Sequence, residues 1–242
     1  MNIIATPFLS LILVLPFLYF GKKRSSESKE FIPTWVLYFL IDMTVTSLPI
    51  EFPSLDFVKL EMNWSGKIYS YILAITFLLF YKRIPLNKFG FTFKQKKGSV
   101  PFAIWTTTTF VLMMMAYSIF IGRYKADIEN ILFQLTMPSI IEEVVYRGIL
   151  LSLFSLLYID NLHIGNINFG IGVVVTSILF GLWHGLNVNV DFEITISWMA
   201  FIYTGLIGFI LALVRERTGS LLFPIIIHVI VNIMPQTMGF IF

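Results

Sequence analysis

Three charged side chains, Glu142, Glu143 and Arg147, lie within six consecutive positions of an otherwise apolar segment. A charged side chain in lipid hydrocarbon costs at least about 2.5–3.5 kcal/mol, so each of the three needs a partner or a wet cavity. Positions four apart share a face of a helix, so Glu143 and Arg147 are expected to pair. Glu142 points to another face and has no partner on its own helix, which suits a general acid or base. The alternative is a purely structural ion cluster.

Two of the three histidines also lie in apolar segments. His228 and Asn232 are four positions apart and share a face, and His184 lies near the end of a separate apolar segment. A single histidine in an apolar helix is more often a structural donor than a catalytic group. Together with the two glutamates, however, these side chains are almost the entire polar content of three segments, and each is costly in lipid when unpaired. We therefore expect them to meet in one cavity.

The composition is that of a polytopic membrane protein. Of 242 residues, 57% are apolar and 13% are charged, about half the usual charged fraction of a quarter. A soluble domain of this length would need an implausibly large core. The chain has no cysteine, which excludes thiol nucleophiles, thiolate metal sites and disulfides. With a modest net charge of +3, membrane lipid is the expected partner and nucleic acid is not.

We predict a single membrane domain over residues 1–242, built as an all-α bundle of about eight transmembrane helices. An isolated segment can satisfy its backbone in lipid only as a helix, and about 20 residues cross the hydrocarbon. The third span is short, which favours a start nearer Trp64. The predicted spans are residues 3–20, 31–50, 68–81, 100–121, 135–159, 169–186, 194–214 and 221–240.

Basic residues gather in three predicted loops. These loops follow the first, third and seventh spans, so all three lie on the same side of the membrane. Residues 21–30 hold four cations, residues 82–99 hold six, and Arg215 and Arg217 follow the seventh span, which makes 12 of the 17 lysines and arginines. The positive-inside rule places these loops in the cytoplasm and both termini outside. Opposite them lie Lys59, Lys67, Arg123 and Lys125.

Polar residues elsewhere have simpler interpretations. Residues 123–134 fit either a short amphipathic helix in the membrane interface or an extension of the fifth span. Asp42, inside the second span, is expected to cap a kink or to line the cavity. His163, Asp191 and Glu193 are expected in solvated loops.

The polar side chains form three motifs on three predicted spans, in the order Glu142-Glu143-x-x-x-Arg147, Phe180-x-x-x-His184 and His228-x-x-x-Asn232. Together they resemble the signature motifs of the CPBP intramembrane endopeptidases. That family includes the CaaX prenyl endopeptidases and the bacterial Abi proteins linked to bacteriocin processing and self-immunity. The resemblance covers roughly residues 138–232 and implies a catalytic core of helices within 135–240 around a water-filled cavity. Residues 1–122 supply helices without a motif.

The resemblance implies proteolysis by a glutamate-activated water. Carried over by motif position, Glu142 and His184 would hold and deprotonate this water, and His228 and Asn232 would stabilise the oxyanion. Spacing does not rank the two glutamates, so Glu143 stays a catalytic candidate, although the family pattern favours Glu142. Arg147 would pair with Glu143 as structural support. The implied substrate is a lipidated protein tail, such as a prenylated CaaX-type tail, or a small hydrophobic peptide.

Other chemistries and functions remain as alternatives. The chain has no Gly-x-Ser-x-Gly elbow and no His-Glu-x-x-His helix. Two glutamates and two histidines could ligate zinc, but we favour a mechanism without metal or cofactor, as the resemblance implies. A non-catalytic immunity or scaffold protein on the same fold is one rival. A transporter that uses the cluster as a proton or cation relay is another, although no inverted repeat is evident.

The predicted orientation conflicts with a cytoplasmic substrate. The fifth span enters from outside, so Glu142 would lie about 10 Å below the outer face at about 1.5 Å per residue. Either the cavity reaches inward, or a helix is miscounted, or the substrate is not a prenylated cytoplasmic tail. A peptide-processing role for a multi-pass protein in a prokaryotic cell membrane would ease the conflict.

Overall fold

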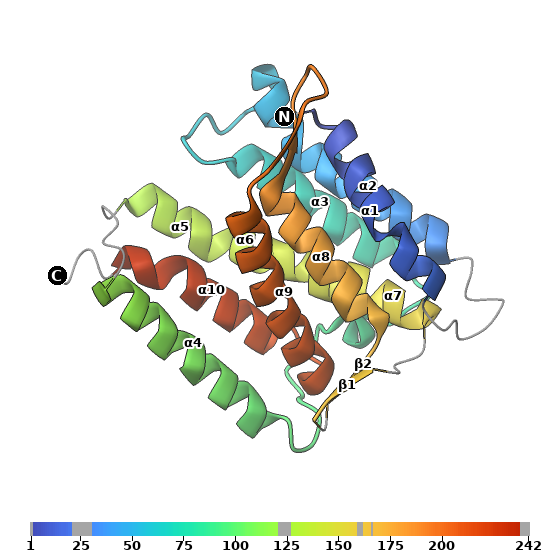
Figure 1. Cartoon of the computed structure of the whole chain (residues 1–242), viewed down its shortest axis with the longest axis vertical. Coiled ribbons are helices and arrows are strands. Elements are labelled where there is room, and N and C mark those ends of the chain that lie inside the picture. Colours follow the sequence, from blue (N-terminus) through green and yellow to red (C-terminus); the bar gives the residue numbers. More distant parts are fainter. Residues whose placement is uncertain (1, 21–30, 121–126, 159–161, 166, 238–242) are drawn as a thin grey trace.

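The computed structural model describes residues 2–20, 31–120, 127–158, 162–165 and 167–237. Within these ranges the chain forms a bundle of tilted helices, which confirms the expected all-α class (Figure 1). Each predicted span corresponds to a helix or to a continuous run of helices. In chain order these are α1 (Ala5–Phe20), α2 (Phe31–Glu51), α3 (Trp64–Phe80), α4 (Val100–Phe120), the run α6 (Pro138–Glu142), η4 (Glu143–Leu150) and α7 (Leu151–Leu157), α8 (Ile171–Gly185), α9 (Trp198–Thr218) and α10 (Leu222–Thr237).

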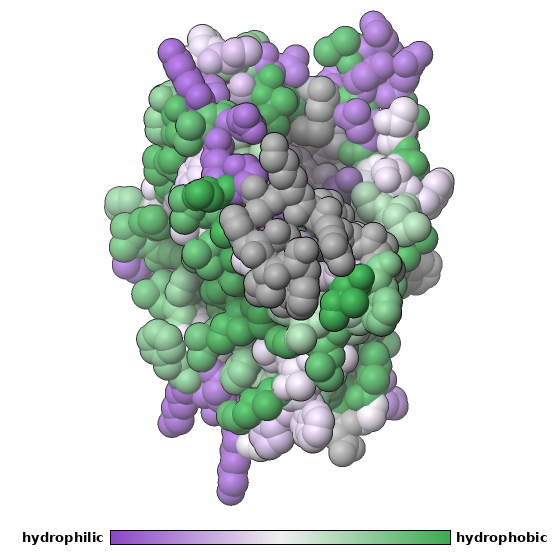
Figure 2. Space-filling model, turned by 90° about the vertical axis from the view of Figure 1, so that its left-hand side faces the viewer, coloured by the Kyte–Doolittle hydropathy of each residue, from purple (hydrophilic) through white to green (hydrophobic). Residues whose placement is uncertain are grey.

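Long apolar helices support a location in a membrane. Three of the described helices, α2, α4 and α9, are long and apolar enough to cross a bilayer. The other apolar helices, α1, α3, α8 and α10, are shorter. Hydrophobic side chains gather on the surface in a broad zone between more hydrophilic ends (Figure 2). The number of helices that cross the membrane stays a prediction.

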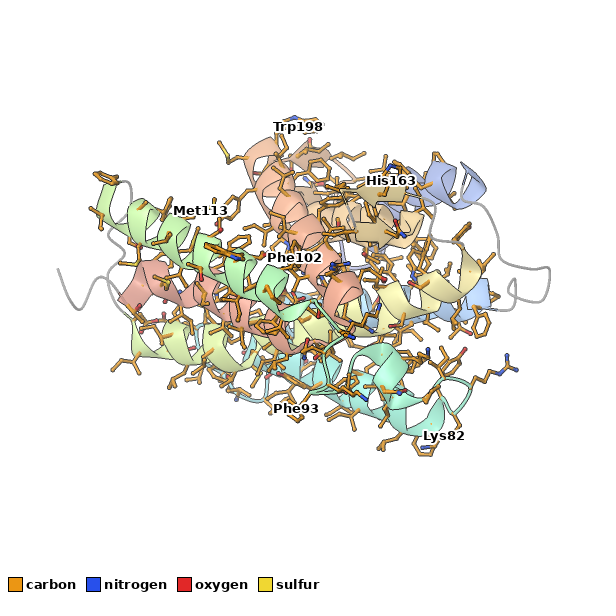
Figure 3. All side chains as sticks on the ribbon, turned by 90° about the horizontal axis from the view of Figure 1, so that it is seen from below. Lys82, Phe93, Phe102, Met113, His163 and Trp198 are labelled. Atoms are coloured by element: carbon orange, nitrogen blue, oxygen red, sulfur yellow. The ribbon has the colours of Figure 1, made fainter. Side chains whose placement is uncertain are left out.

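Helix α4 lies at the edge of the bundle, where it packs against α10 (Figures 1 and 3). Phe110 and Met114 are buried in this contact. Trp105 and Met113 are strongly exposed on the same helix, and Met113 is labelled in Figure 3. One face of α4 therefore packs on the protein while large apolar side chains elsewhere on it remain available to lipid.

Two short β-hairpins were not expected from the sequence. In one, β1 (Leu162–Ile164) pairs antiparallel with β2 (Ile167–Phe169), and in the other, β3 (Leu186–Val188) pairs antiparallel with β4 (Ile194–Ile196). The predicted start of the seventh span at residue 194 is therefore wrong, because residues 194–196 are strand and α9 begins at Trp198. Its predicted end is wrong as well, since Arg215 and Arg217 belong to the last turn of α9.

The segment before the motif helix is a separate helix, so its interpretation as an extension of the fifth span is wrong. Helix α5 runs from Ile128 to Thr136, and the Asp127 side chain accepts hydrogen bonds from two amides of its first turn. The chain then leaves helical geometry at Met137, and Pro138 opens α6 in the position that suits proline best. Arg123 and Lys125 lie outside the described residues.

The first motif lies on an unusual stretch of helix. The eight residues Glu143–Leu150 form a π-helix between two α-helical segments, and all eight are buried. π-Helical turns are rare overall. Those that occur are often at functional sites, because they change the direction in which side chains point. A short 3₁₀ helix, η2 (Pro53–Leu55), follows α2, and another, η3 (Leu86–Phe89), follows α3.

The N-terminal helices pack directly on the motif helix. Trp35 on α2 meets the ring of Phe154 on α7 edge to face, with ring centroids 5.4 Å apart. Tyr146 of the π-helix donates a hydrogen bond to the sulfur of Met43 on α2. One hydrophobic cluster contains buried residues of α1, α2, α3, α6 to α8 and η4. The division into residues 1–122 and 135–240 stays a prediction, but the two parts share this core.

Candidate active site

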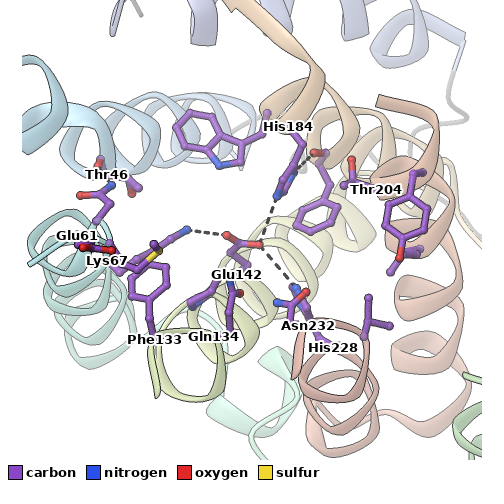
Figure 4. Close-up of a pocket in the computed structure, with 18 residues that line it drawn as sticks. Thr46, Glu61, Lys67, Phe133, Gln134, Glu142, His184, Thr204, His228 and Asn232 are labelled. Carbon is purple, nitrogen blue, oxygen red and sulfur yellow. Dashed lines mark hydrogen bonds and ion pairs between the residues drawn. The ribbon is translucent and has the colours of Figure 1, made fainter. Parts of the chain in front are cut away.

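Four of the five side chains that were expected to meet line one cavity, and the fifth, Glu143, does not. The volume of the cavity is about 480 Å³, and Glu142, His184, His228 and Asn232 all border it (Figure 4). Glu142 comes from the end of α6, His184 from the last turn of α8, and the other two from successive turns of α10. The cavity is also bordered by α2, α3, α5 and α9. Three motifs that are far apart in the sequence thus reach the same space.

One carboxylate oxygen of Glu142 faces both imidazoles. Its Oε2 lies 4.0 Å from Nε2 of His184 and 3.9 Å from Nε2 of His228. These separations are longer than a direct hydrogen bond. They are short enough for one water molecule to bond to the carboxylate and to an imidazole together.

The ring of His184 is fixed from behind by the backbone. Its Nδ1 lies 2.8 Å from the carbonyl oxygen of Phe180, one turn earlier on α8. Because a carbonyl can only accept, Nδ1 carries the proton of the neutral ring, and Nε2 presents a lone pair to the cavity. The Phe180 ring packs beside the same imidazole, with centroids 4.6 Å apart.

Glu143 lies behind the cavity and does not line it. It is fully buried, and its Oε1 accepts a hydrogen bond from Nη1 of Arg147 at 2.8 Å, so the expected pair is confirmed. The same oxygen lies 2.7 Å from Nδ1 of His228. The guanidinium of Arg147 also stacks over the Phe180 ring at 4.3 Å from its centroid. Glu143 thereby turns Nε2 of His228 toward Glu142.

Asn232 is held at the cavity wall by α6. Its amide Nδ2 donates to the hydroxyl of Ser139 at 3.1 Å, and Ser139 is completely buried. The carboxamide lies one turn beyond His228 on the same face of α10, as the four-residue spacing predicts. The catalytic roles of Asn232 and of the other four candidates stay predictions.

Sequence reasoning missed a partner of Glu142. Nζ of Lys67 lies 2.6 Å from Glu142 Oε1, with both side chains largely buried. Lys67 was assigned to an outer loop, and this assignment is wrong because α3 begins at Trp64 and contains it. The shortness of the predicted third span was the signal that could have found it. Glu142 therefore has an ionic partner on another helix.

Asp42 lies close to this pair, on α2. Its Oδ1 accepts a hydrogen bond of 2.6 Å from the Ser70 hydroxyl on α3. Asp42 borders a narrow gap that Lys67 and Glu142 also border, but it does not line the main cavity. The interpretation of Asp42 as a cavity-lining residue is therefore wrong for the main cavity.

The cavity and the basic loops lie at opposite ends of the bundle. Lys67, in the first turn of α3, borders the cavity, whereas Arg83 follows the other end of this helix. At that end Arg83, Lys88 and Arg215 line a separate hollow of about 690 Å³. The structure thus preserves the separation that the sequence predicts between the polar cluster and the basic loops.

No group of three or more histidine, cysteine or acidic side chains has metal-binding geometry within the described residues. His228 is also bound at Nδ1 by Glu143, and Glu142 is bound at Oε1 by Lys67. The expectation of a site without metal or cofactor stays a prediction.

The comparisons with known proteins identify one region. Residues 124–234 match the model of a family described as "Type II CAAX prenyl endopeptidase Rce1-like". The match includes all three motifs and begins after α4, so α1 to α4 lie outside it. No curated protein and no solved structure is significantly similar to the chain.

Proposed function

Because residues 124–234 match the model of a type II CAAX prenyl endopeptidase family, we propose that this protein is an intramembrane endopeptidase that uses a glutamate-activated water. Its substrate is a lipidated protein tail or a small hydrophobic peptide. The observation that carries the proposal is the position of Glu142 Oε2, which faces Nε2 of both His184 and His228 across about one water's width.

In the proposed reaction, a water molecule lies between Glu142 and His184. The water donates one hydrogen bond to Glu142 Oε2 and a second to the lone pair of His184 Nε2, which orients its oxygen toward the substrate. As that oxygen attacks the scissile carbonyl carbon, its proton passes to Glu142. The carboxyl group later returns this proton to the leaving nitrogen, so that the peptide bond breaks without a covalent enzyme intermediate.

His228 and Asn232 then stabilise the oxyanion that forms on the carbonyl oxygen. Asn232 donates through its amide, and His228 donates from Nε2 when the ring carries both protons. Glu143 supports this role because its carboxylate holds Nδ1 of the same ring. Removing one such donor typically costs about 10²–10³ in rate.

The lining of the cavity supports a hydrophobic substrate. Phe133, Trp183 and Ile207 contribute apolar surface, and Gln134 and Thr204 lie among them with polar groups. Apolar walls with a few polar groups can accept hydrophobic side chains and bind the backbone amides of a peptide at the same time.

The test compares purified wild-type protein with Glu142→Ala in detergent. A farnesylated CaaX-type peptide and a panel of unmodified hydrophobic membrane peptides are offered, and the products are identified by mass spectrometry. We expect the wild type to cleave at least one peptide and the variant to lose at least about 10²-fold in rate, because the general base is gone.

Glu193→Gln serves as the matched control, since Glu193 is an exposed carboxylate on the β3–β4 hairpin. This variant should cleave like the wild type. Equal cleavage by wild type and Glu142→Ala would contradict the assignment of the base. An immunity or scaffold protein would instead keep its cellular function in Glu142→Ala, and a transporter would show flux in proteoliposomes.

A further inference from the structure

We propose that Lys67 is a positioning residue of this active site, supplied by α3 from outside the family-matched region, which holds Glu142 ionised and turned toward the two histidines. The inference rests on the proposed function. It adds a member to the site that none of the three motifs contains.

The contact divides the two oxygens of the carboxylate between two tasks. Lys67 Nζ binds Oε1 at 2.6 Å, while Oε2 faces His184 and His228. Lys67 reaches Glu142 from the side opposite the two imidazoles (Figure 4). With Oε1 held, the carboxylate cannot rotate freely, and Oε2 is the oxygen left to accept a proton from water.

Lys67 supplies a positive charge to Glu142 that none of the three motifs supplies. Glu142 and Glu143 are adjacent, and both are buried. Arg147 compensates Glu143 through its hydrogen bond to Oε1. Among the described residues, Lys67 is the lysine or arginine that forms an ion pair with Glu142. An opposite charge at this distance favours the ionised carboxylate, which is the form that a general base needs.

The surroundings of Lys67 fix its backbone. Asn63 caps α3, because its side chain accepts a hydrogen bond from the amide of Gly66 and donates one to the carbonyl oxygen of Thr46 on α2. At Gly66 a Cβ atom would collide with this same carbonyl oxygen, so the absence of a side chain lets α3 approach α2 closely. One turn further on, Ser70 hydrogen-bonds to Asp42. The backbone at Lys67 is therefore well fixed.

The side chain of Lys67 has little freedom to point elsewhere. Only 10% of it is exposed, compared with 9% of the Glu142 side chain. A buried ammonium without a counter-ion is strongly unfavourable, so the lysine is expected to keep this contact. This makes Lys67 different from Lys59, which is exposed in the segment before α3.

The experiment measures kcat and KM for Lys67→Met, Lys67→Arg and the control Lys59→Met, on a peptide that the wild type cleaves. We expect Lys67→Met to lower kcat by about 10-fold or more while KM changes by less than about 3-fold. The substitution should impair the general base Glu142 and leave substrate binding intact. Lys67→Arg should recover most of the lost kcat, since it restores the positive charge. Lys59→Met should behave like the wild type.

A thermal unfolding cycle covers the case in which Lys67→Met folds poorly. Lys67→Met and Glu142→Gln are each compared with the double variant. If the two side chains act as a pair, the double variant loses less stability than the sum of the two single losses. Additive losses would overturn the inference, as would a folded Lys67→Met with wild-type kcat.

The outcomes also separate this inference from the proposed function. Loss of cleavage in Glu142→Gln together with full cleavage in Lys67→Met would overturn the role of Lys67 alone. A wild-type protein that cleaves none of the peptides, or a fully active Glu142→Gln, would overturn the proposed function and the inference with it.

Discussion

Glu142 and Glu143 are neighbours in the chain with different surroundings. Glu142 borders the cavity and is paired with Lys67, whereas Glu143 is sealed behind it between Arg147 and His228. The same residue type therefore has two different environments at adjacent positions. Adjacent positions on a helix point about 100° apart, and the π-helix begins between them.

The buried pair of Glu143 and Arg147 leads to a prediction about stability. Glu143→Gln removes one charge and leaves the guanidinium buried without a counter-ion, which should lower the free energy of unfolding by about 3–5 kcal/mol. The readout is thermal or denaturant unfolding in detergent, with Glu193→Gln as an exposed control.

The double variant Glu143→Gln/Arg147→Met provides the check on this reason. Removing both charges should restore part of the lost stability, because no unpaired ion remains. A double variant that is less stable than either single variant would show that the pair is not the cause.

Most of the helices could be predicted from apolar run length, but several of their ends and interruptions could not. α2 and α4 match their predicted ranges to within a residue at each end. The seventh span was misplaced because Ile194 and Ile196 are apolar residues of a hairpin and because Arg215 is buried within a helix. The sequence does not distinguish the π-helix from an ordinary α-helix, because Glu143 and Arg147 are spaced as on an α-helix.

The site was largely predictable because its members are costly polar groups in apolar segments. That argument alone led us to expect Glu142, His184, His228 and Asn232 in one cavity, but it also placed Glu143 there, and Glu143 lies behind the cavity wall. This argument did not identify Lys67, because Lys67 lies near the end of a predicted span, where a lysine can also extend to the membrane interface. Its burial depends on the packing of α3 against α2, which sequence periodicity does not reveal.

Close packing of α8 on α9 leads to a prediction about single methyl groups. A Cβ at Gly181 would lie 2.6 Å from the backbone oxygen of Phe201, whereas at Gly205 the nearest atom would be 3.6 Å away. Gly181→Ala should therefore destabilise the protein by about 1–3 kcal/mol, because backbone must move. Gly205→Ala, on the same contact, should cost much less. Equal melting temperatures for the two variants would contradict this geometry.

The whole molecule has two chemically different ends. The candidate active site lies near the first turn of α3, and the basic hollow lies beyond the end of this 17-residue helix, about 25 Å away along its axis. If the basic end is cytoplasmic, as the positive-inside rule predicts, the cavity lies nearer the other face of the membrane. The orientation therefore decides which substrates can reach Glu142.

The absence of cysteine from the sequence makes this orientation directly measurable. Val190→Cys places a thiol on the exposed β3–β4 hairpin, and Lys82→Cys places one at the basic end, where Lys82 is exposed (Figure 3). In intact cells a membrane-impermeant maleimide should label position 190 at once and position 82 only after permeabilisation. The reverse pattern would put the cavity on the cytoplasmic side and make a CaaX-type tail the more accessible substrate.

The pairing of Lys67 with Glu142 joins two parts of the gene. The three motifs lie within residues 142–232, while the cation that pairs with Glu142 lies on α3, upstream of the family-matched residues. A single codon change at position 67 would therefore alter the charge beside Glu142 and leave every motif residue intact.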